Sequence, residues 1–300
     1  MRTAFIEELI AQARLDPSIF LVVGDLGYSV VEPFAQEFPD RFLNAGVAEQ
    51  NMTGVAAGLA SEGYHVFTYS IANFPTLRCL EQIRNDICYH NLPVTVVSVG
   101  AGLAYGNLGY SHHGVQDLAA LRGMPNLSIC SPADPGEARE CLQWLVANPH
   151  PSYLRLGKAG EMNLHEKRGI EKSPLLIREG NPHHSVVATG SVLLCALEAA
   201  EQLSVKGIDL SVYSWPLINQ VDVTQDHPIV CSDTIFTVEE HVRPGGFGEF
   251  VAGQLGHKAR CHAFSVPVSV SGLTGSQNAL RKASGLDRDS MAEQITRILV

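Results

Sequence analysis

Short apolar runs alternate along this chain with longer segments in which apolar residues recur at helical spacing. The short runs show no apolar–polar alternation, which is typical of strands in a parallel sheet that helices cover on both faces. They predict strands at 19–23, 94–99, 127–130, 185–188 and 235–238. The helical spacing predicts helices around 5–13, 47–59 and 193–203. Repeated strand–helix units of this kind predict an α/β fold.

The segment from 157 to 182 interrupts this alternation. It is rich in charged residues, contains Pro174 and Pro182, and has little apolar periodicity. Such a segment is typical of a connection between domains. We therefore expect two doubly wound α/β domains, at 1–160 and 183–300, joined by a linker at 161–182.

The charge balance narrows the choice of partners. Acidic residues outnumber basic ones by 31 to 21, which gives a net charge of −10, and an acidic chain without a basic run repels phosphate backbones. No apolar run approaches the ~20 residues of a membrane-spanning helix. Nucleic acid and membranes are therefore not expected as partners.

The cysteines and the N-terminal segment bear on location. The seven cysteines are scattered and never form a CxxC pair, which predicts reduced thiols and no zinc site. The first residues contain acids among the apolar positions and no small-residue cleavage site, so they do not resemble a signal peptide. We expect a cytoplasmic protein that holds no metal with its own residues.

One carboxylate, Glu49, falls in the first turn of a predicted helix that is rich in small residues. An acid at this position gains about 0.3–1 kcal/mol from the helix dipole, and that structural role is sufficient to explain it. The helix is expected to be buried on most sides, however, and a buried carboxylate needs a partner. The pattern therefore leaves open whether Glu49 is a structural or a functional residue.

Two loops contain further candidate residues. His112 and His113 are adjacent in a glycine-rich loop before a predicted helix at 115–121. They are either an exposed pair or groups that exchange protons or hydrogen bonds with a substrate, and their spacing does not match a two-histidine metal site. The segment 24–27, which includes Asp25, resembles half of a phosphate-binding loop, although a simple turn also explains its glycines.

Several longer motifs resemble the C-terminal half of transketolase, in the form that two-subunit transketolases encode as a separate chain. The motifs are RFLNAGVAEQNM (41–52), EQIRN (81–85), SHHGVQD (111–117), MPNL (124–127), SPAD (131–134), ATGS (188–191) and VEEHVRPGGFG (238–248). The resemblance runs almost from end to end. It implies that 1–160 is a domain that binds the pyrimidine of thiamine diphosphate and that 183–300 is the transketolase C-terminal domain, which has no direct cofactor role.

The resemblance also implies a partner. In this family a different domain, which carries a GDG motif and a downstream asparagine, holds the diphosphate and its Mg²⁺. The present sequence contains no GDG. We therefore expect a diphosphate-binding partner subunit that resembles the N-terminal half of transketolase, and an α₂β₂ heterotetramer.

Individual residues take on roles through the same resemblance. Glu49 matches the catalytic glutamate, which exchanges a proton with the aminopyrimidine of the cofactor and must hold that proton near neutral pH in a buried place. Ile71 stands where an aromatic residue stacks on the pyrimidine, Phe74 matches a second aromatic residue of the pocket, and Asp25 is expected to contact the cofactor. The residues implied to bind substrate are Arg2, Ser29, His112, His113 and Arg155, with His112 also implied in catalysis. Arg2, Ser29 and Arg155 match positions that bind a substrate phosphate, which suits charge-assisted hydrogen bonds.

The chain departs from the family at two positions near the sugar. Leu108 replaces an aspartate that binds a ketose hydroxyl, and Gly100 replaces a histidine. The expected activity is transfer of a two-carbon ketol unit between sugars or sugar phosphates. One alternative is a subunit of a thiamine-dependent carboligase or dehydrogenase that uses 2-oxo acids, which the loss of the aspartate favours. Another is a non-catalytic scaffold or regulatory homologue, against which the retention of Glu49 argues.

Overall fold

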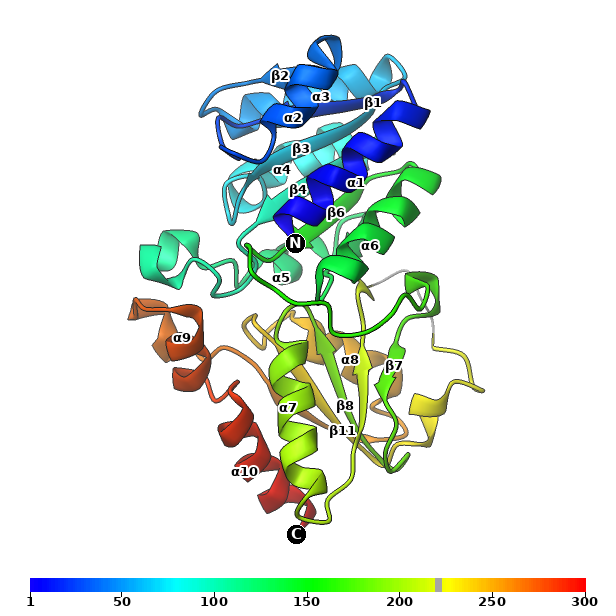
Figure 1. The fold of residues 1–300 in the computed structure, drawn as a ribbon, viewed down its shortest axis with the longest axis vertical. Coiled ribbons are helices and arrows are strands. Elements are labelled where there is room, and N and C mark those ends of the chain that lie inside the picture. Colours follow the sequence, from blue (N-terminus) through cyan, green and yellow to red (C-terminus); the bar gives the residue numbers. More distant parts are fainter. Residues whose placement is uncertain (219–222) are drawn as a thin grey trace.

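The computed structural model describes residues 1–218 and 223–300, which form two sheets stacked end to end (Figure 1). The first sheet has seven strands in the order β10-β5-β6-β4-β3-β1-β2, and all neighbours are parallel except β10 and β5. Its strands are β1 (Ile19–Val23), β2 (Phe42–Asn44), β3 (His65–Ile71), β4 (Val94–Val99), β5 (Ser128–Cys130), β6 (Ser152–Leu156) and β10 (Leu217–Ile218).

The second sheet has five strands in the order β12-β11-β8-β9-β7, of which the edge strand β7 is antiparallel. Its strands are β7 (Leu175–Arg178), β8 (His184–Thr189), β9 (Ser211–Ser214), β11 (Thr234–Glu239) and β12 (Arg260–Phe264). Because β7 lies within the segment expected to be a linker, the second sheet begins before residue 183. The two sheets are also not formed by two separate stretches of the chain, since β10 follows β9 in sequence but belongs to the first sheet.

Helices cover both faces of each sheet, which confirms the predicted doubly wound α/β class. On the first sheet, α1 and α6 pack together on one face and α3 packs on the other, while α7 and α10 cover one face of the second sheet and α8 the other (Figure 1). The helices are α1 (Arg2–Leu15), α2 (Glu32–Glu37), α3 (Glu49–Ser61), α4 (Leu80–Gln82), α5 (Asp117–Leu121), α6 (Pro135–Ala147), α7 (Leu193–Ser204), α8 (Phe247–Leu255), α9 (Gln277–Ala283) and α10 (Arg288–Leu299). A π-helical segment, Ile83–Cys88, continues α4.

One apolar core connects the two halves. The cluster that contains Met52 of α3 and Ile129 of β5 also contains Trp215 and, from α8, Phe247 and Val251. All of these side chains are fully buried. Within the part of the chain that the structure describes, no helix is long and apolar enough to cross a membrane.

The loops that contain most of the predicted site residues lie at one edge of the first sheet. The adjacent strands β4, β3, β1 and β2 are parallel, so their carboxyl ends meet at the same edge. The loops that leave them are 24–31, 45–48, 72–79 and 100–116. The chain leaves β1 to one side for β2 and returns on the other for β3, and such a switch in strand order opens a crevice where α/β proteins bind ligands.

Candidate active site

Glu49 is the first residue of α3 and points into the protein. Its side chain is only 1% exposed. Oε2 accepts a hydrogen bond from Nη1 of Arg78 at 2.5 Å, whereas Oε1 is buried and has no hydrogen-bond partner. The residue before the helix, Ala48, makes no side-chain cap. Glu49 is therefore placed near the helix dipole, but its burial and the free oxygen go beyond what a structural acid requires.

Arg78 connects Glu49 with the other sequence-predicted residues. Its guanidinium carbon lies 4.4 Å from the centroid of the Phe74 ring, and Phe74 meets the His112 ring edge to face at 5.3 Å. The structure thus brings Glu49, Phe74 and His112 together at the carboxyl edge of the sheet. Ile71, the last residue of β3, is half-buried on the same edge.

The two histidines of the 100–116 loop have different environments. His112 is half-buried, and its Nδ1 lies 3.0 Å from the Ser111 hydroxyl. His113 is buried, its Nε2 has no hydrogen-bond partner, and burial lowers its pKa from the ordinary value. The side chain of Asn73 donates hydrogen bonds to the carbonyls of Ser111 and His113, which ties this loop to the one after β3.

A cavity of about 210 Å³ lies beside the loop that follows β1. Arg2, Tyr28, Ile71 and Tyr105 are among the side chains that line it. The Arg2 Nε is buried and has no hydrogen-bond partner. A cationic donor without a partner at the wall of a cavity suits an anionic group, so this cavity agrees with the expectation that Arg2 contacts substrate.

Tyr105 explains why position 100 is glycine. Gly100 has a φ of +99°, and a Cβ built there would lie 2.2 Å from Cδ2 of the Tyr105 ring. The ring therefore fills the space that a side chain at position 100 would occupy. Tyr105 also lines the cavity, and burial raises the pKa of its phenol.

The loop after β1 has an unusual backbone at both of its predicted site residues. Asp25 and Ser29 have φ angles of 55° and 63°, a region that non-glycine residues rarely adopt and that often occurs at functional sites. The Asp25 carboxylate accepts a hydrogen bond from the Asn44 amide at 2.9 Å, and Ser29 is exposed. Asp25 is thus held beside the end of β2, at the carboxyl edge of the sheet.

Arg155, which is expected to bind a substrate phosphate, lies in a buried network of its own. Its side chain is 2% exposed and forms an ion pair at 2.7 Å with Asp117, which is equally buried. Its Nη2 also donates to the carbonyls of Gly114 and Glu240. The guanidinium therefore joins the 100–116 loop to the second half of the chain and does not line the cavity that contains Arg2.

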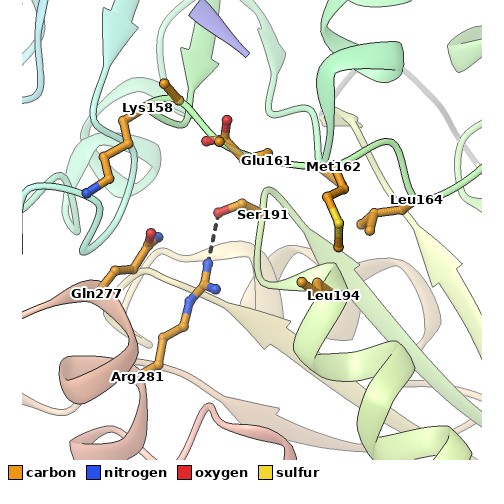
Figure 2. A pocket seen from close by; sticks show the side chains of 11 residues that line it. Lys158, Glu161, Met162, Leu164, Ser191, Leu194, Gln277 and Arg281 are labelled. Atoms are coloured by element: carbon orange, nitrogen blue, oxygen red, sulfur yellow. Dashed lines mark hydrogen bonds between the residues drawn. The ribbon is translucent and has the colours of Figure 1, made fainter.

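A separate cavity of about 170 Å³ lies between the two halves of the chain, and Figure 2 shows its lining. Lys158 and Glu161 come from the segment 157–182. Ser191 and Arg281 come from the second half and share a hydrogen bond of 2.9 Å. None of the residues around Glu49 lines this cavity.

Exposed apolar side chains surround the Glu49 site. The examples are Tyr28, Val47, Leu77, Leu108 and Tyr110, each more than a third exposed. They come from all four loops of the carboxyl edge. A group of exposed apolar side chains is typical of a surface that another protein covers.

The residues around Glu49 fit the polar edge of a small heterocycle. Besides Glu49 Oε1, the hydroxyl of Ser70 is buried without a hydrogen-bond partner. The Ser70 hydroxyl and the Glu49 Cγ lie 3.4 and 3.5 Å from the place of a Cβ on Gly24, so both face the same small space. Over residues 1–218 and 223–300, no three His, Cys, Asp or Glu side chains gather where they could hold a metal ion.

Arg78, Ser70 and Tyr105 were not predicted from the sequence. Glu49 and Arg78 are 29 positions apart, and their contact depends on how α3 packs beside β3. Ser70 lies in β3, a strand that was not among the predicted ones. For Tyr105, the only signal was the unexplained glycine five residues earlier.

Comparison with known proteins defines the class of this molecule. The model of the transketolase pyrimidine-binding domain matches residues 1–160, and that of the transketolase C-terminal domain matches residues 175–291. The chain therefore belongs to the transketolase family of thiamine-diphosphate-dependent enzymes, which confirms the resemblance.

Within the family, similar proteins include separate subunits. The chain is 33% identical to a protein from Phocaeicola vulgatus that is named as one subunit of an apulose-4-phosphate transketolase, over 97% of this chain and 95% of the relative. A solved structure described as a split gene transketolase, inactive beta4 tetramer, superimposes with a TM-score of 0.84 at 30% identity and covers 99% of this chain and 96% of that one. A 1-deoxy-D-xylulose-5-phosphate synthase from Geobacter sulfurreducens is 32% identical over 87% of this chain but only 43% of its own length.

Proposed function

We propose that this chain is the pyrimidine-binding β subunit of a split transketolase-like enzyme, which transfers a two-carbon ketol unit between sugars or sugar phosphates. The observation that carries the proposal is Glu49, a buried carboxylate with one oxygen paired to Arg78 and the other without a partner. A buried carboxylate oxygen without a partner is costly unless a ligand completes the site.

Thiamine diphosphate supplies the carbanion chemistry when it is bound. Of this chain's residues, Glu49 would exchange a proton through Oε1, and Ser70 would offer its hydroxyl to the same ligand edge. Ile71 and Phe74 would cover the ring, while Asp25 would contact the cofactor from the loop after β1. His112, which packs on Phe74, would hydrogen-bond the substrate.

A partner subunit would complete the cofactor site. It would hold the diphosphate and Mg²⁺, for which this chain has no matching motif, and would cover the exposed apolar side chains around Glu49. We propose an α₂β₂ heterotetramer located in the cytoplasm, where thiols such as the buried Cys79 and Cys88 remain reduced. The inactive β₄ tetramer of the similar split-gene structure supports the idea that the β chain needs its partner for activity.

The residues at the substrate end of the site suit a sugar that carries an anionic group. Arg2, with its unpaired Nε, and the exposed Ser29 would bind a phosphate, and His113 would contact the sugar through its unpaired Nε2. The name of the Phocaeicola vulgatus relative contains a phosphorylated sugar, which agrees with this choice.

A second candidate is a reaction that uses a 2-oxo acid as donor. Leu108 is 50% exposed in the loop where the family places an aspartate, and its side chain cannot accept a hydrogen bond from a hydroxyl. A donor substrate that lacks the corresponding hydroxyl would lose no hydrogen bond at this position. The similarity to a synthase of a deoxy sugar phosphate favours this alternative.

The test is an assay with the diphosphate-binding subunit, thiamine diphosphate and Mg²⁺, with each subunit alone as the control. We expect ketol transfer from a ketose phosphate to an aldose only when both subunits are present. Consumption of a 2-oxo acid in place of the ketose would establish the second candidate. If the two subunits together support neither reaction, the proposal of a catalytic subunit is wrong.

A further inference from the structure

We propose that Arg78 is the positioning residue of Glu49. It holds one carboxylate oxygen so that the other remains free for the cofactor. This inference rests on the proposed function and adds to it the group that orients the catalytic carboxyl.

The two oxygens of the Glu49 carboxylate have different surroundings. Arg78 Nη1 donates to Oε2 at 2.5 Å, and the Glu49 side chain is 1% exposed. Because this bond and the surrounding packing fix the carboxylate plane, Oε1 is held in one direction although it has no partner of its own. A catalytic acid or base must be held within hydrogen-bond reach of its ligand, and Arg78 provides this hold before any ligand arrives.

Arg78 also supplies the positive charge beside this carboxylate. Its guanidinium lies at hydrogen-bond distance from Oε2, and a buried carboxylate is costly unless a cation or a hydrogen-bond donor is paired with it. Cys79 also lies near Glu49, but burial raises the pKa of its thiol, so it is neutral and adds no charge.

The environment of Arg78 allows this role. Its side chain is 45% exposed, and its guanidinium stacks on Phe74 at 4.4 Å. The arginine is thus supported by an aromatic ring on the wall of the site and is accessible from the surface that we propose the partner covers. It can keep Glu49 paired in the free chain and adjust when cofactor and partner bind.

The first experiment uses the full chain without a partner and measures urea unfolding at pH 8. Arg78→Met is expected to lower the unfolding midpoint when Glu49 is present, because it leaves the buried carboxylate unpaired. In the Glu49→Gln background the same change should have little effect. Arg84→Met is the matched control, since Arg84 lies in the next turn, is exposed and bonds only to its neighbour Asn85.

The second experiment uses the enzyme assembled with its diphosphate-binding subunit. Arg78→Met should weaken thiamine diphosphate binding in calorimetry by roughly 10- to 100-fold, the range for one charge-assisted hydrogen bond. It should also lower kcat at saturating cofactor, because the carboxylate is then no longer held toward the ligand. Arg78→Lys keeps a cationic donor at this place, so it should recover part of the cofactor affinity and of the kcat that Arg78→Met loses.

The outcomes separate this inference from the proposed function. If Arg78→Met changes unfolding equally in the wild-type and Glu49→Gln backgrounds, the two side chains do not interact and the inference is wrong. If the wild-type assembly binds thiamine diphosphate but the Arg78 variants bind it equally well with an unchanged kcat, the ion pair is structural and the inference is again wrong. An assembly that fails to bind the cofactor even as wild type overturns the proposed function itself, and the role of Arg78 with it.

Discussion

At the scale of single residues, the proposed chemistry depends on one buried carboxylate. Glu49 combines three properties: it is 1% exposed, it is paired through Oε2, and it has a free Oε1. A side chain that only capped a helix would have no need of the last property. The free oxygen is the feature that connects the fold to the proposed proton transfer.

Replacing Glu49 tests this connection. Glu49→Gln keeps the shape of the side chain but cannot carry the proton, so turnover of the assembled enzyme should fall by about 10²–10⁴-fold, the range for a positioned acid or base. Cofactor binding should weaken much less. Steady-state kinetics and calorimetry on the same preparation measure both effects, and turnover within a few-fold of wild type would return Glu49 to a structural role.

Two arginines that both match the family's phosphate site should behave differently. Arg155→Ala leaves the buried Asp117 without its cation, and loss of one partner from a buried pair costs about 3–5 kcal/mol of stability. Arg2→Ala should instead raise KM for phosphorylated sugars while the free energy of unfolding changes little. Chemical denaturation and a panel of sugars with and without phosphate distinguish the two; equal KM effects with no loss of stability for Arg155→Ala would contradict this assignment.

The residue scale also shows the limit of prediction from sequence. The motif around Glu49 identified the carboxylate, and His112 and Phe74 do lie close to each other at this edge. Arg155 matched a motif equally well, but its environment depends on Asp117 and on the carbonyl of Glu240, which only the packing of the two halves brings together. A motif position gives a residue's identity but not the groups that surround it.

At the scale of elements, His165 holds the segment 157–182 against α6. His165 lies 2.8 Å from the Glu137 carboxylate. Burial opposes a charge on His165, but the hydrogen bonds to Glu137 and to the Glu166 carbonyl and the negative charges of Glu137 and Asp134 outweigh it and raise the pKa to about 9. The folded protein therefore favours protonated His165.

This contact predicts a pH dependence of stability. Because the pKa is raised from 6.5 to about 9 on folding, the stabilisation is fully present below pH 6.5 and is lost as the pH rises through 9. His165→Gln should remove this part of the decline in the free energy of unfolding, whereas His183→Gln, at an exposed pair with Asp233, should not. Urea unfolding between pH 6 and pH 9.5 measures this decline, since the range includes both pKa values. If the free energy of unfolding changes with pH in the same way for wild type and His165→Gln, the contact does not titrate.

Elements were predictable where the local pattern is strong. The predicted strands at 19–23 and 94–99 correspond to β1 and β4 residue for residue. α1 and α7 cover the helices predicted at 5–13 and 193–203, and α3 begins two residues later than the helix predicted at 47–59. The central strand β3 was missed because its sequence, HVFTYSI, mixes polar and apolar residues. The edge strand β7 was missed because it lies in a charged segment, where its pairing with β9 outweighs the local pattern.

At the scale of the whole molecule, the chain forms one body with an incomplete site. The apolar core that includes Met52 and Phe247 runs through both halves, so the second half supports the first although it lines no part of the Glu49 site. The site lies at the carboxyl edge of the first sheet and is open toward exposed apolar side chains. We propose that this edge is half of a cofactor site, which a partner subunit completes.

Calorimetric titration of thiamine diphosphate with Mg²⁺ is the most direct test of this central claim. We expect no binding tighter than the millimolar range to this chain alone, because it offers groups for the pyrimidine and none for the diphosphate, and micromolar or tighter binding, about −8 kcal/mol, once the diphosphate-binding subunit is added. The diphosphate-binding subunit titrated alone is the control. Micromolar binding to the isolated chain would contradict the account.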